Sequence, residues 1–150
     1  MKRRTIRVSA SVGILLAVFL MSTAFVCTSA QQTQASKYAD SYAQSLKSIH
    51  DAVDSALVSG KLTPAEKQNA YKALLKANEA GLHINSAIRA VAAATGPVSA
   101  VQAAIAEASS AIDDGTASIK NPDTLAIVKS LAASAKAILG QIAEVYVKGA

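Results

Sequence analysis

The stretch that decides the fold, residues 63–97, reads TPAEKQNAYKALLKANEAGLHINSAIRAVAAATGP. At its start the Thr63 hydroxyl can accept a free backbone amide, while the Glu66 carboxylate reaches back to the first turn. Small or apolar residues then recur at alternating steps of four and three: Ala70, Leu74, Ala77, Gly81, Ile84, Ile88 and Val91. This period predicts a long helix packed along one seam, and the small members predict the close approach of a neighbour. The helix is predicted to end near Ala94, before a Thr-Gly-Pro break.

Three further amphipathic helices are predicted from the same spacing of apolar residues. They cover residues 36–59, 98–115 and 121–148, and the first is expected to stop at a Gly60 cap while the last opens at an Asn121 cap. Short connections between amphipathic helices are typical of bundles. We therefore predict an all-α fold, an alanine-rich antiparallel four-helix bundle preceded by an N-terminal signal helix.

The N-terminus has the order of a secretory signal peptide. Four basic residues lie in the first seven positions, an uncharged stretch follows that is most apolar over residues 14–26, and small residues surround Ala30. This pattern predicts cleavage after Ala30. Residues 1–30 are then a signal peptide and residues 31–150 a helical bundle domain, with a periplasmic or secreted location.

Two other fates remain open for this segment, and both hold the protein at a membrane. Lipidation at Cys27 is the first, although the preceding Ala24-Phe25-Val26 is bulkier than the Leu-Ala-Gly of a bacterial lipobox. The second is an uncleaved anchor, because residues 8–36 carry no charge and are long enough to span a bilayer. Membrane contact is therefore expected through residues 8–30 if the segment is retained.

Charge and cysteine content limit the choice of partners. The formal net charge is +5, but beyond residue 30 eleven basic residues face ten acidic ones. A balance so close to neutral argues against nucleic acid as a partner. Cys27 is the single cysteine, so the predicted domain has no disulfide and relies on packing.

The two histidines of the sequence suggest surface pairs rather than a metal site. His50 lies beside Asp51 and four residues before Asp54, and Glu79 lies four residues before His83. Both four-residue spacings place a carboxylate and an imidazole on one helical face. A structural or catalytic zinc site needs three or four converging ligands. We therefore predict no bound metal.

No motif in the sequence carries a specific chemistry. There is no Cys-x-x-Cys-His haem attachment and no Gly-x-Ser-x-Gly nucleophile elbow, so no cofactor and no enzymatic activity are expected. Ser109, Ser110 and Ser130 are expected to face solvent or small packing gaps. Asp113 and Asp114 are expected in a solvated turn before Gly115.

Tyrosines and alanines are the candidates for contact surfaces. Four tyrosines, at positions 38, 42, 71 and 146, lie on or beside the apolar stripes. They either line a ligand pocket or sit at core edges with their hydroxyls in water, and we favour the core edge. Alanine runs make some helix faces apolar nearly all round: Ala87, Ala90, Ala92, Ala93 and Ala94, then Ala103, Ala104 and Ala106. Such surplus apolar surface can meet a second subunit, a partner or lipid.

These observations favour an exported, non-enzymatic helical bundle that acts through protein contacts or self-association in the cell envelope. A membrane- or lipid-anchored envelope module and a carrier of a small apolar ligand are the alternatives. The junction over residues 57–66 resembles a helix–Gly–Leu-Thr-x-x-Glu–helix hairpin of small bacterial and phage-encoded helical proteins. That resemblance implies a helix stop followed by a capping box, and no particular function.

Overall fold

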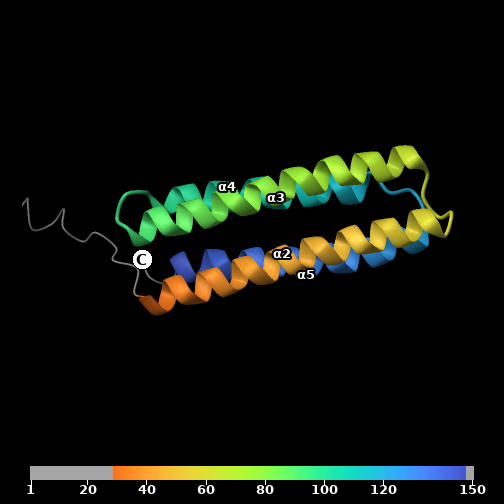
Figure 1. Cartoon of the computed structure of the whole chain (residues 1–150). Helices are drawn as coiled ribbons and strands as arrows, with labels where there is room; N and C mark the ends of the chain where they lie inside the picture. Colours follow the sequence, from red (N-terminus) through yellow and green to blue (C-terminus); the bar gives the residue numbers. More distant parts are fainter. Residues whose placement is uncertain (1–28, 148–150) are drawn as a thin grey trace, which may run out of the picture.

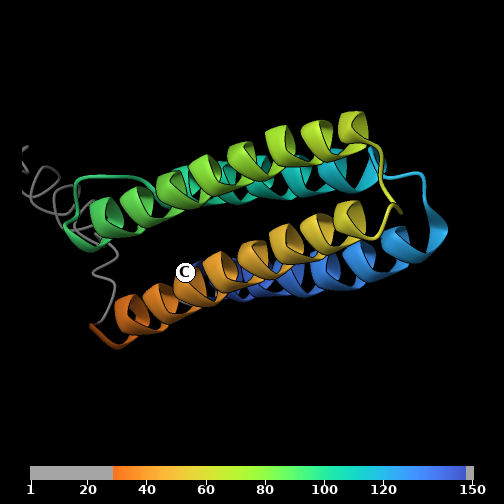
Figure 2. The same cartoon turned by 45° about the vertical axis from the view of Figure 1, so that its right-hand side comes forward.

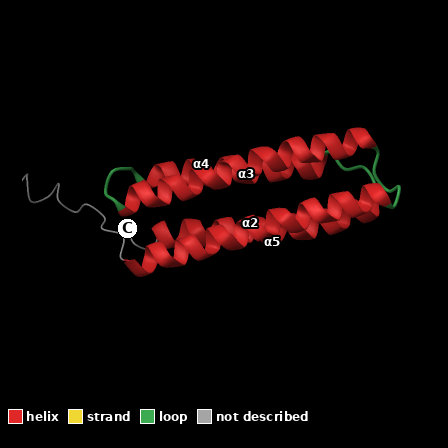
Figure 3. Ribbon diagram, viewed as in Figure 1, coloured by secondary structure: helices red, strands yellow, loops and turns green. Residues whose placement is uncertain are grey.

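The computed structural model describes residues 29–147, and within them the chain forms four helices and no strand (Figures 1 and 3). The helices are α2 (Ser29–Val58), α3 (Pro64–Ala92), α4 (Val98–Ala117) and α5 (Pro122–Val147). This confirms the all-α class and the bundle of packed helices. The predicted signal helix and Cys27 lie outside the described residues, and Ala30 lies exposed in the first turn of α2.

The bundle is built from two close helix pairs, α3 with α4 and α2 with α5 (Figures 1 and 2). Further contacts join α2 to α3 and α4 to α5, so that each helix touches two others. The α2–α3 and α4–α5 loops lie at one end of the bundle, and the α3–α4 loop lies at the other (Figure 1).

Alanine side chains let α3 approach α4 closely. Ala73 lies against Gly115 of α4, where an added Cβ would come within 3.0 Å of the Ala73 methyl group. The predicted seam of α3 is therefore partly wrong, because Leu74 and Gly81 are only half-buried and Ala73 and Ala80 take their places in the core. The smallest side chains face the closest neighbour, and this rotates the buried stripe toward α4.

Tyr42 joins the two pairs across the interface of α2 and α3. Its hydroxyl donates to the Ala77 carbonyl at 2.9 Å, and burial raises the pKa of this phenol. The Tyr42 ring lies against Gly81, where an added Cβ would lie 3.0 Å from the ring carbon Cε1. Glycine at position 81 therefore makes room for the ring.

The placement of the tyrosines corrects the core-edge prediction at two positions. Tyr42 and Tyr146 are 2% and 5% exposed, so both belong to the core. Tyr38 and Tyr71 are half-buried, as a position at the core edge requires. The spacing of apolar residues placed all four tyrosines on or beside the apolar stripes. It could not tell which of them lie at the centre of a stripe and which lie at its edge.

Both predicted N-terminal caps are confirmed. The Thr63 hydroxyl accepts the Glu66 amide at 3.2 Å, and the Thr63 amide donates to Glu66 Oε2 at 2.9 Å. In α5, Asn121 Oδ1 accepts the Thr124 amide at 3.0 Å. Glu66 Oε1 also accepts the Lys120 amide at 2.9 Å, so one carboxylate holds two loops together.

Two predicted helix ends are wrong. Helix α2 begins at Ser29 rather than Ser36, because Thr33 donates to the Ser29 carbonyl at 2.8 Å and the fully buried Ala35 packs in the core. Helix α4 runs through the expected stop at Gly115 to Ala117. Lys136 of α5 binds Asp113 at 2.7 Å, which offsets the unfavourable placement of an acid near a helix C-terminus.

Two helix stops use the left-handed backbone conformation. Gly60 has φ 69°, and the Lys61 amide donates to the Ala56 carbonyl at 2.8 Å, which confirms the predicted glycine cap. Helix α3 ends in the same way, with the Thr95 amide bound to the Ala90 carbonyl at 2.9 Å. There, however, the left-handed residue is Ala94, with φ 55°. An alanine Cβ is strained in this region.

Replacing Ala94 by glycine should raise the free energy of unfolding by about 0.5–1 kcal/mol. Relief of about 1–2 kcal/mol of left-handed strain exceeds the entropy that glycine adds to the unfolded chain. Urea denaturation followed by circular dichroism measures the change. Ala93→Gly is the matched control, because Ala93 has φ −82° and should lose stability. If the Ala94→Gly variant is no more stable than the natural chain, Ala94 is not strained in the left-handed conformation.

Candidate functional site

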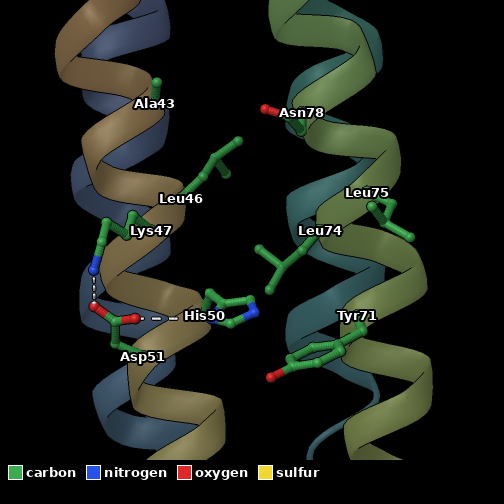
Figure 4. Close-up of a pocket in the computed structure, with 9 residues that line it drawn as sticks. All are labelled: Ala43, Leu46, Lys47, His50, Asp51, Tyr71, Leu74, Leu75 and Asn78. Atoms are coloured by element: carbon green, nitrogen blue, oxygen red, sulfur yellow. Dashed lines mark hydrogen bonds and ion pairs between the residues drawn. The ribbon is translucent and has the colours of Figure 1, made fainter.

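A groove runs along the outer side of α2 and α3, with a volume of about 520 Å³ (Figure 4). Leu46 of α2 and Leu74 of α3 point into it from opposite sides, and Leu75 lies on its α3 side. Ala43 and Asn78 lie toward one end, and His50 and Tyr71 lie toward the other. The groove therefore has apolar walls and one polar end.

The position of the groove follows from the pairing of the helices. Helices α2 and α3 belong to different close pairs, and the large Tyr42 side chain lies between them, against Gly81 and bonded to the Ala77 carbonyl. Along α2 the lining runs from Ala43 to Asp51, and along α3 from Tyr71 to Asn78. Each wall spans about two helical turns, or roughly 10 Å of helix length.

Four side chains form a polar clamp at one end of the groove: His50 and Asp54 of α2 with Lys67 and Tyr71 of α3. The His50 and Tyr71 rings stack with centroids 4.7 Å apart and planes 12° from parallel. The Tyr71 hydroxyl donates to Asp54 Oδ1, and Lys67 Nζ lies 2.8 Å from the same oxygen. The Lys67 ammonium also lies 4.8 Å from the centre of the Tyr71 ring. The clamp thus ties α2 to α3 by ion pairing, hydrogen bonding and stacking.

The clamp keeps Asp54 ionised. The Lys67 ammonium lowers the pKa of the Asp54 carboxyl, and the Tyr71 hydroxyl lowers it further. A carboxylate with a lowered pKa is a weak general base at neutral pH, so the clamp fits a structural role. Because the folded pKa lies below the unfolded one, this stabilisation is present at neutral pH and is lost as the pH falls below about 4.

The histidine predictions have different outcomes. His50 Nδ1 lies 3.6 Å from Asp54 Oδ2 and 3.7 Å from Asp51 Oδ1, which confirms the expected pairing. For His83 the prediction is wrong, because its Nδ1 lies 3.3 Å from Glu107 Oε2 on α4. Position 83 faces the neighbouring helix α4, so a carboxylate there replaces the intrahelical one.

The other candidates do not assemble a reactive site in the described part of the chain. Over residues 29–147 no three His, Cys, Asp or Glu side chains are grouped to hold a metal ion. Ser110 and Ser130 are exposed and Ser109 is half-buried. The turn expected at Asp113 and Asp114 is wrong, since both lie within helix α4.

Two further features lie on the α5 side of the bundle. A more polar hollow of about 340 Å³ lies between α2 and α5, lined by Gln31, Gln34, Tyr38, Gln141, Glu144 and Val145. Among the described helices, α5 alone is long and apolar enough to cross a membrane, with a mean hydropathy of 1.4 over the most apolar 18 residues of Pro122–Tyr146. In the bundle α5 packs against α2 and α4.

Sequence reasoning did not predict the groove, although His50, Asp51, Tyr71 and Leu74 of its lining had been named for other reasons. Leu75 and Leu82 are 64% and 63% exposed, although both lie in a helix whose apolar seam was recognised. The signal was their seven-residue spacing on a second face of α3, outside that seam. Lys67 and its link to Asp54 left no signal, because the two residues meet only when α2 and α3 pack.

Comparison with known proteins gives no relative: no protein-family model, no curated protein and no solved structure matches the chain.

Replacing Lys67 by methionine should raise the pKa of the Asp54 carboxyl toward its ordinary value, because the ammonium is the main cause of its lowering. Carboxyl ¹³C chemical shifts followed through an acid titration measure this directly. Tyr71→Phe should give a smaller rise. Lys136→Met, which removes the partner of Asp113 instead, is the control and should leave Asp54 unchanged. An Asp54 pKa unaffected by Lys67→Met would disprove the proposed clamp.

Proposed function

We propose that this protein is an exported, non-enzymatic, antiparallel four-helix bundle that acts through protein contacts in the cell envelope. The α2–α3 groove is proposed as its contact site, and an amphipathic helix of a partner protein as the occupant. Export is supported by the basic head, apolar stretch and small residues that end at Ala30.

The observation that carries the proposal is the apolar groove of about 520 Å³ between α2 and α3. Leu46 and Leu74 already belong to the core or its margin, whereas Leu75 is 64% exposed beside them. A helix two turns long presents apolar anchors at positions i, i+3 or i+4, and i+7, and these match walls about 10 Å long. A partner helix would cover Leu75 and leave the polar clamp at the edge of the contact.

A small apolar ligand is the second candidate, because the groove volume lies within the range of sites that hold drug-sized molecules. Such sites usually enclose most of the ligand surface, whereas this groove lies open along the outer side of two helices (Figure 4). The open side favours a protein occupant that supplies its own cover.

Expression of the full-length gene in a Gram-negative host tests export. We expect a soluble periplasmic product whose intact mass corresponds to a chain starting at Gln31, because Ala30 ends the predicted cleavage site. Ala30→Leu is the matched variant and should block processing. A membrane-bound product with a lipid mass at Cys27 would support the lipid-anchored module instead, and a membrane-bound full-length product would support the retained anchor.

Photo-cross-linking in the native cell tests the groove. An ultraviolet-activated amino acid in place of Asn78 should give a covalent adduct with one protein, because Asn78 lines the groove. The same amino acid in place of the exposed Ser110 on α4 is the control and should give none. Leu74→Ser in the Asn78-labelled chain should reduce the adduct, with a melting curve to confirm the fold. A small-molecule adduct alone would favour the ligand carrier, and equal labelling at both positions would reject the groove.

A further inference from the structure

The outer face of α3 is a second surface, and it shares Leu75 with the groove. We define the outer α3 face by seven residues spaced at alternating steps of four and three: Gln68, Lys72, Leu75, Glu79, Leu82, Ser86 and Arg89. All seven are exposed. Leu75 and Leu82 are two of the four large apolar side chains that stand most exposed in the described residues. Lying seven residues apart, they form a short apolar ridge along α3.

Unpaired cations surround this ridge. Lys72 and Lys76 lie on either side of Leu75 in the sequence, and Arg89 lies one heptad after Leu82. None of these three makes an ion pair with another described residue, whereas Lys47, Lys61, Lys67 and Lys136 each bind a carboxylate. Glu79 is the single acid on the outer α3 face. The face is therefore cationic and partly apolar in a domain that is close to neutral.

A second copy of the chain fits this face poorly. Antiparallel pairing that places Leu75 opposite Leu82 brings Glu79 against its own counterpart near the two-fold axis. Parallel pairing brings Lys72 against Lys72 and Arg89 against Arg89. Like charges opposite one another in a helix pair are destabilising. Lys72, Lys76 and Arg89 against the single acid Glu79 leave a net charge of +2, which complements an anionic surface.

We propose that the outer α3 face docks on an anionic phospholipid surface, with α3 lying parallel to the membrane plane. Leu75 and Leu82 enter the interface between headgroups and acyl chains, while Lys72, Lys76 and Arg89 contact lipid phosphates. Apolar residues on one side of a helix with basic residues beside them are typical of helices that lie in the interface. Because Leu75 also lines the groove, this docking needs a groove without an occupant over Leu75. It does not depend on retention of residues 1–28.

A tryptophan reporter tests the docking locally, because the sequence contains no tryptophan. The protein expressed from the full-length gene carries Leu82→Trp and is mixed with vesicles of equal parts phosphatidylglycerol and phosphatidylcholine. Its emission should shift to the blue, the shift should disappear with phosphatidylcholine alone, and it should weaken as salt increases. The control is Ile127→Trp, 56% exposed in the natural chain on α5, a helix that does not contact α3. Its emission should not change.

Charge reversal separates the outer α3 face from a general effect of net charge. In the Leu82→Trp chain, Lys72→Glu with Lys76→Glu should weaken vesicle binding at least about tenfold, since each basic side chain near an anionic surface contributes about fivefold. Lys37→Glu with Lys129→Glu makes the same change of charge on α2 and α5 and should weaken it about twofold or less.

No shift at position 82, equal shifts at positions 82 and 127, or equal loss in the two charge-reversed chains would overturn the proposal. A shift that depends on protein concentration without vesicles, together with a dimer mass in sedimentation, would show that a second copy covers the face and would also overturn it. The cross-linking experiment at Asn78 is read separately, so a failure of docking leaves the groove proposal standing.

Discussion

The contact between Tyr42 and α3 is the constraint on which the rest of the bundle depends. The buried phenol donates to the Ala77 carbonyl at 2.9 Å and occupies the space left by Gly81. A buried hydroxyl without a partner is costly, so the hydrogen bond fixes how far α2 and α3 slide past each other. Helix α5 packs closely on α2, and α4 packs closely on α3. The register between α2 and α3 therefore also sets the position of one close pair relative to the other. The polar clamp holds the same interface from its outer side, through Lys67 and Asp54.

The groove lies between the two close helix pairs, where packing is looser than within the α3–α4 pair. Small residues let α3 and α4 approach closely, as at Ala73 and Gly115, but they offer little side chain to fill the space between the pairs. Leu46 and Leu74 fill only part of that space, and a groove of about 520 Å³ remains on the outside. The same helix α3 therefore serves three surfaces: a tight one toward α4, a looser one toward α2, and an exposed one with Leu82 and Lys72. The apolar residues on two sides of α3 face α4 and α2, and those on its third side stay exposed.

The sequence predicts the helices well and their mutual placement poorly. Caps and stops are local, so Thr63, Asn121 and Gly60 could be recognised from their neighbours along the chain. The end of α4 could not, because it depends on contacts far away in the sequence: Gly115 packs against Ala73 of α3, and Asp113 pairs with Lys136 of α5. The groove and the clamp also depend on helix packing, and the pairing of His83 with Glu107 shows how a partner on another helix replaces an expected intrahelical one. The second apolar face formed by Leu75 and Leu82 could have been predicted from the sequence, since the two leucines lie seven residues apart.

The loops at one end of the bundle are joined by charged and polar groups. Glu66 caps α3 and binds the Lys120 amide, and Lys61 lies 3.6 Å from Asp123. These contacts connect the α2–α3 loop to the α4–α5 loop without a covalent link, whereas many small secreted domains use disulfides for stability. No cysteine occurs in residues 29–147, so the folding of this part of the chain does not wait for oxidation. The same bundle can therefore form in a reducing and in an oxidising compartment. The redox state of the compartment does not determine when the bundle folds.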